Sequence, residues 1–178
     1  MNNQQKTLGL ILLLGGLAVV GSYVHAALAY PSELAALWGD VPAELLPIYT
    51  TNMFLGAAGF FAYSFFVLFR IDPEQTIIFN MAGYSLFYWI YLGILVPSAL
   101  WTPLALQMLE EPSAVLWLLI RVVLALTGLS SLALLAALIT LKPKQSGWAY
   151  GLAVMGAIFF CFQTVLLDAV IWPVFFPF

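Results

Sequence analysis

Long apolar runs alternate with short polar segments along the whole chain. Each run is about as long as the roughly 20 residues that an α-helix needs to cross the hydrocarbon core of a bilayer. Strands of a membrane β-barrel would instead show segments of about 10 residues with alternating polarity. The pattern therefore predicts an all-α, polytopic membrane protein in which residues 1–178 form one bundle. The five predicted transmembrane helices cover residues 8–29, 47–69, 76–100, 114–141 and 148–172.

The first predicted helix also resembles a secretory signal. Lys6 precedes its apolar run, and Ala27, Leu28 and Ala29 form an A-x-A sequence before Tyr30. The apolar run is as long as a full membrane span, whereas the core of a signal peptide has only about 7–15 residues. We therefore expect a retained helix.

Composition narrows the class of protein further. Of the 178 residues, only 7% are charged, whereas globular domains average about 25%, so a soluble enzyme and a disordered chain are both excluded. The net charge of −3 comes without any basic patch, which argues against nucleic-acid binding. The single cysteine, Cys161, excludes an internal disulfide.

Basic residues near the predicted helix ends are confined to alternate connections. Lys6, Arg70, Lys142 and Lys144 flank the amino terminus and the second and fourth connections. The first and third connections carry acidic charges and no Lys or Arg. The positive-inside rule then predicts a cytoplasmic amino terminus and a carboxyl terminus outside. We expect a multi-pass protein of the plasma membrane or of a bacterial inner membrane.

The first connection, residues 30–46, is the longest. Ser32 followed by Glu33 and an apolar stretch predicts a capped short helix that Gly39 can end. Such a segment either lies along the outer membrane surface as an interfacial helix or serves as an ordered connector, and the second interpretation is favoured.

Four polar side chains inside the predicted spans share one depth. Arg121 and Asp168 belong to consecutive helices, and His25 and Asn52 belong to the first two. At about 1.5 Å rise per residue, all four lie roughly 6–11 Å below the outer boundary. Because an isolated charge there costs several kcal/mol, we predict an ion pair between Arg121 and Asp168.

A tyrosine stripe marks the third predicted helix. Tyr84, Tyr88 and Tyr91 lie on one face of that helix. Together with the four polar groups they form either packing seams between helices or the walls of a pocket open towards the outer leaflet. The first interpretation is slightly favoured, although ionisable groups inside a membrane raise the odds of a functional site.

The sequence gives little evidence for a catalytic or a metal centre. One histidine cannot supply the three or four ligands of a metal site, and Ser130 and Ser131 lie far from it along the bundle. We therefore predict no catalytic residues and no metal site, and the sequence identifies no cofactor.

The leading functional hypothesis is a non-enzymatic protein that binds a lipophilic small molecule. Its candidate ligand-binding residues are His25, Asn52, Tyr84, Tyr88, Tyr91, Arg121 and Asp168. One alternative is a small membrane isomerase acting on an isoprenoid or sterol-like substrate, with Asp168 as acid or base. Another is a structural subunit of a larger membrane complex. Partners beyond the lipid bilayer, including a second copy of the chain, stay open.

Overall fold

The computed structural model describes residues 1–176, which are helical apart from connections and two isolated β-bridges. Within these residues, five helical segments are long and apolar enough to cross a membrane, which confirms the expected all-α fold and the expected number of long helices. The first four are α1 (Asn3–Ala29), α2 (Leu46–Phe69), α3 (Leu86–Glu110) and α4 (Ala114–Thr140). The fifth, Trp148–Phe175, consists of α5 (Trp148–Cys161), a π-helix, η2 (Phe162–Ile171), and α6 (Trp172–Phe175). A short 3₁₀-helix, η1 (Ala36–Trp38), lies in the first connection.

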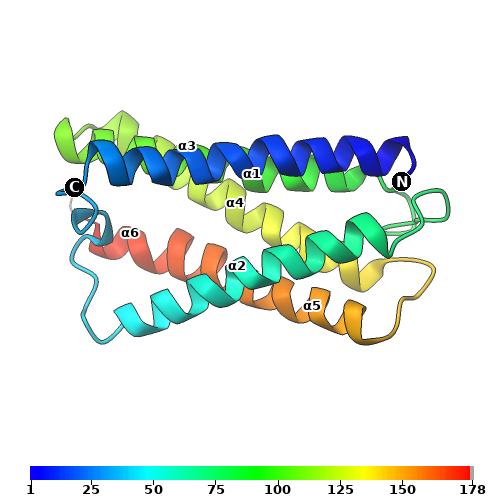
Figure 1. Ribbon diagram of the computed structural model, residues 1–178. Coiled ribbons are helices and arrows are strands. Elements are labelled where there is room, and N and C mark those ends of the chain that lie inside the picture. Colours follow the sequence, from blue (N-terminus) through cyan, green and yellow to red (C-terminus); the bar gives the residue numbers. More distant parts are fainter. Residues whose placement is uncertain (177–178) are drawn as a thin grey trace.

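The helices form one elongated bundle. Helix α1 packs on α3, α3 packs on α4, and α4 packs on α5 and η2, while α2 packs mainly on α5 (Figure 1). Helices α1 and α2 contact each other only sparsely, so the bundle is less closed between them.

The third helix differs from the sequence prediction by ten residues at each end. It was expected at 76–100, but it begins at Leu86 and continues through Pro97 and Pro103 to Glu110. Residues 70–85 form a connection instead, in which Phe79 and Asn80 adopt positive φ angles of 54° and 59°. A proline inside a helix is tolerated in such proteins because neighbouring helices and side chains compensate for the lost backbone hydrogen bond.

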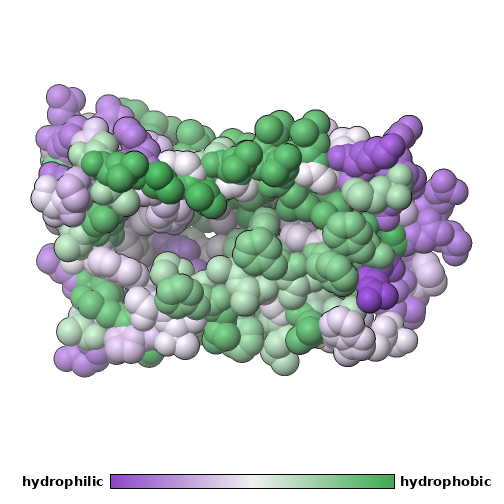
Figure 2. Space-filling model, in the orientation of Figure 1, coloured by the Kyte–Doolittle hydropathy of each residue, from purple (hydrophilic) through white to green (hydrophobic). Residues whose placement is uncertain are grey.

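Hydrophilic residues gather at the two ends of the bundle, and the flank between them is largely apolar (Figure 2). The amino terminus lies at one end, with the connections 70–85 and 141–147 (Figure 1). At the other end lie the first connection, residues 30–45, and the short connection 111–113. We call this second end the first-loop end. The basic residues Lys6, Arg70, Lys142 and Lys144 are thus separated from the acidic residues of the first and third connections, as the sequence predicts.

Two glycines set the distance between α2 and α5. A methyl group on Gly156 would lie 2.6 Å from the Cα atom of Gly59. The two backbones are therefore in direct contact at this crossing, as small residues permit in membrane helices. The half of the bundle that contains the amino terminus is filled by one large apolar cluster, which includes Tyr63, Phe87 and Leu134.

Candidate functional site

A cavity of about 480 Å³ occupies the half of the bundle nearer the first-loop end. All five long helices contribute to its lining, together with the first connection. Most of the lining is apolar and aromatic. The aromatic residues that line it are Tyr23, Trp38, Tyr49, Trp101, Phe160 and Trp172. Figure 2 shows a hollow on this half of the molecule, between α1 and α2, with hydrophilic surface at its floor.

The hydrophilic part of the wall is built on the π-helix. In a π-helix the hydrogen bonds join residues i and i+5, so Gln163 and Asp168 follow one another along one face. The Nε2 atom of Gln163 donates to Oδ1 of Asp168 at 2.8 Å. Both side chains line the cavity. The π-helical segment is thus what aligns an amide and a carboxylate on one wall.

Asn52 of α2 extends this arrangement across a helix boundary. Its Nδ2 atom donates to Oε1 of Gln163 and to the carbonyl oxygen of Phe159, each at 3.1 Å. Both donor hydrogens of the Asn52 amide are therefore used. The result is the chain Asn52–Gln163–Asp168, in which each side chain donates to the next. The Gln163 amide accepts a hydrogen bond from Asn52 and donates one to Asp168, and these two bonds define its orientation.

Tyr49 ties the beginning of α2 to the same segment. Its hydroxyl group is buried and donates to the carbonyl oxygen of Leu167 at 2.8 Å. Its ring also lines the cavity and meets the ring of Trp38 edge to face at 5.9 Å. The wall on the α2 side is therefore held in place by the hydroxyl of Tyr49 and the amide of Asn52.

The first connection covers the cavity at the first-loop end. The indole Nε1 atom of Trp172 donates to the carbonyl oxygen of Leu37 at 2.9 Å. The backbone N–H of Asp40 donates to the carbonyl oxygen of Phe175 at 2.7 Å. Gly39 between them has a φ of 61°, and a methyl group there would lie 2.9 Å from the Cα atom of Phe176. This connection is thus attached to α6, although its helix is a single 3₁₀ turn without a side-chain cap and not the capped short helix expected.

The predicted ion pair between Arg121 and Asp168 is absent. Within residues 1–176 no basic nitrogen lies within 4.0 Å of Asp168, and Arg121 is exposed on α4 with its guanidinium 5.8 Å from the ring centroid of Trp117. The buried stripe of α4 includes Ile120, and the next residue is turned by about 100° around the helix axis. Arg121 is not among the buried residues of α4, and the prediction of an ion pair was wrong.

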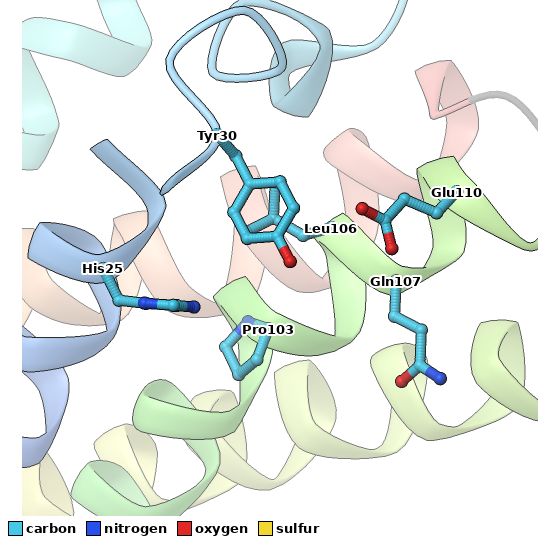
Figure 3. Close-up of a pocket in the computed structure, with 6 residues that line it drawn as sticks. All are labelled: His25, Tyr30, Pro103, Leu106, Gln107 and Glu110. Carbon is cyan, nitrogen blue, oxygen red and sulfur yellow. The ribbon is translucent and has the colours of Figure 1, made fainter. Parts of the chain in front are cut away.

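His25 also lies outside the cavity. It is exposed on α1, and its ring meets that of Tyr30 edge to face at 5.8 Å. Figure 3 shows both rings at a smaller pocket of about 260 Å³, where Gln107 and Glu110 of α3 contribute polar atoms. No group of three or more His, Cys, Asp or Glu side chains in residues 1–176 could hold a metal ion.

The three tyrosines of the predicted stripe hold the opposite half of the bundle together. Tyr84 donates to the carbonyl oxygen of Val67, Tyr88 to that of Gln4, and the Tyr91 hydroxyl lies 3.0 Å from Ser64 Oγ. Burial raises the pKa of Tyr84, which precedes α3, so its hydroxyl stays a neutral donor. None of these three lines the larger cavity.

Of the seven candidate residues, Asp168 lines the larger cavity and Asn52 is linked to it through Gln163. Sequence reasoning missed Gln163, which joins them, and it did not include Trp38, Trp101 and Trp172 among the candidate ligand-binding residues. An amide five residues before an intramembrane carboxylate was the available signal for Gln163, because polar groups in a span need partners. No known protein family, curated protein or solved structure matches this chain.

Proposed function

We propose that this protein is a non-enzymatic membrane protein that binds a lipophilic small molecule in the cavity at the first-loop end. The observation that carries the proposal is the cavity itself: about 480 Å³, mostly apolar and aromatic, with Gln163 and Asp168 on one wall and Asn52 hydrogen-bonded to Gln163. Small-molecule sites typically have about 300–1,000 Å³, an apolar lining and a few convergent polar groups. With the amino terminus in the cytoplasm, the site lies towards the outer leaflet of a plasma or bacterial inner membrane.

The position of the hollow on the flank of the bundle supports entry of a ligand from the bilayer. The hollow lies on the flank between α1 and α2 and not at the polar end of the bundle (Figure 2). At that end the first connection, attached to α6, stands between the cavity and water. A ligand that partitions into lipid would thus reach the site sideways, with its polar end directed at Gln163 and Asp168.

Two neighbouring alanines of α2 provide a matched test. Both side chains are exposed, but Ala57 lines the cavity and Ala58 does not. The protein and the variants Ala57→Phe and Ala58→Phe would be purified from their native membrane and analysed by native mass spectrometry. We expect a retained small molecule with the unmodified protein and Ala58→Phe, and its loss with Ala57→Phe, because the added ring fills the cavity.

The same experiment separates the other functions considered. A co-purified protein without a small molecule would contradict the proposal and favour a subunit of a larger complex. Retention of the molecule by Ala57→Phe would contradict binding in this cavity. If the retained molecule were an isoprenoid or sterol-like compound that the unmodified protein isomerised and the Asp168→Asn variant did not, the enzyme hypothesis would replace a purely binding role.

A further inference from the structure

Within residues 1–176, Asp168 has no cationic partner. All five basic residues of the chain lie elsewhere: Lys6, Arg70, Lys142 and Lys144 belong to the opposite end of the bundle, and Arg121 is exposed on α4. A carboxylate on an apolar wall is costly unless a positive charge and further hydrogen bonds compensate for the water it has lost. A cationic ligand in the cavity would supply that missing positive charge.

The hydrogen bonding of Asp168 leaves room for that ligand. Gln163 donates to Oδ1, and no side chain or backbone group of residues 1–176 donates to Oδ2. An ionised carboxylate accepts about four hydrogen bonds. Gln163 therefore orients the group while most of its acceptor positions still face the cavity that Asp168 lines.

Aromatic rings surround the same region of the cavity. Tyr23 and Tyr49, from α1 and α2, line the cavity together with Asp168. The Trp101 ring lies 6.2 Å from Tyr23 and 5.7 Å from Trp172. Ring faces attract cations, and alkylated ammonium groups are bound in proteins by such groups of aromatic residues. The carboxyl group of Asp168 and the aromatic rings therefore both favour a cationic ligand.

We infer that the cavity binds a lipophilic amine, with the protonated nitrogen at Asp168 and the hydrocarbon part along the apolar lining. This inference rests on the proposed function, since it specifies the chemical class of the ligand for that same cavity. The ammonium donates to Oδ2 of Asp168, and Tyr23 and Tyr49 flank it. A neutral lipophile of the same length would fill the apolar lining without using the charge.

Decylamine and decanol differ mainly in that charge, so they test the inference. The protein would be reconstituted in nanodiscs of zwitterionic phosphatidylcholine at pH 7, and binding would be followed by tryptophan fluorescence, with affinities corrected for partition of each probe into empty nanodiscs. Hydrogen bonds to charged groups lead us to expect decylamine to bind about tenfold to a hundredfold more tightly than decanol.

Two variants locate the effect. Asp168→Asn keeps an acceptor for Gln163 and should lose the preference for decylamine, so that the two probes bind with similar affinities. Glu44→Gln removes an exposed carboxylate at the same end of the bundle and should keep the preference, which excludes a general attraction of the amine to an acidic surface. If Asp168→Asn no longer bound decanol either, Asp168→Glu, which restores the charge, should regain both the binding and the preference.

The outcomes distinguish the two proposals. Equal affinities of decylamine and decanol in the unmodified protein would overturn the amine inference and leave lipophile binding standing. A preference for the amine that persisted in Asp168→Asn would overturn it as well. Failure of both probes to bind, together with no retained molecule in native mass spectrometry, would overturn the proposed function itself.

Discussion

The contact between Gly59 and Gly156 allows a quantitative prediction about the bundle that carries the cavity. In Gly156→Ala, the new methyl carbon would lie 2.6 Å from Cα and 2.9 Å from the carbonyl oxygen of Gly59. Carbon atoms prefer a separation of about 3.5–4.0 Å. Because the obstacle is backbone and cannot rotate away, α2 and α5 must move apart by roughly 1 Å.

The expected cost follows from overpacking. Inserting a methyl group into a well-packed contact costs about 1–3 kcal/mol, and the higher intrinsic helix propensity of alanine returns about 1 kcal/mol. The control is Gly151→Ala on the same helix, where a methyl group meets no atom within 4 Å. Since both variants gain the same propensity, the difference between them measures the contact alone, and we expect Gly156→Ala to be less stable by about 1–3 kcal/mol.

The assay is reversible unfolding in mixed micelles with an increasing fraction of SDS, followed by circular dichroism. The separation of the helices should also weaken the bonds from Asn52 to Phe159 and Gln163, so the variant should bind a cavity ligand more weakly. Equal free energies of unfolding for Gly156→Ala and Gly151→Ala would refute the reasoning, because the two backbones would then not be in contact.

Three further changes test other parts of the structure. Arg121→Leu should change the free energy of unfolding by no more than about 0.5 kcal/mol, as for an exposed residue, and a loss of several kcal/mol would show a buried pair after all. Gly39→Ala should loosen the first connection from Phe175, because it strains a positive φ and crowds the backbone. Limited proteolysis should then cut this connection faster than in the unmodified protein, and unchanged cleavage would contradict its attachment. Single cysteines at Glu33 and Lys142, in a background without the native cysteine, should be labelled from opposite sides of the membrane, with Glu33 outside, and labelling from one side would refute the topology.

The wrong prediction of an ion pair between Arg121 and Asp168 shows a limit of prediction from sequence. Their depth could be estimated by counting residues from the helix ends, and helix order made them neighbours. Their direction around the helix axes could not be read, because α4 is apolar on nearly every face and its pattern does not distinguish the side that packs from the side that meets lipid. Asp168 also lies in a π-helix, whose turns are wider than those of an α-helix.

The third helix shows a similar limit. The prolines at positions 97 and 103 suggest a helix end near residue 100, since proline breaks helices in water. In the structure the helix continues through both to Glu110. The start at Leu86 is set by the turn at Phe79 and Asn80 and by the pairing of Ile77 with Lys142, a contact between residues far apart in the chain.

The sequence by itself therefore determined the all-helical fold, the number of long helices and the separation of basic from acidic connections. The physical reason is that the bilayer imposes a length and a polarity on each segment separately. Only the tertiary structure decided which polar side chains meet. Asn52, Gln163 and Asp168 are joined by helix rotation, by the π-helical turn and by the packing of α2 against η2, and none of these leaves a local mark in an almost wholly apolar chain.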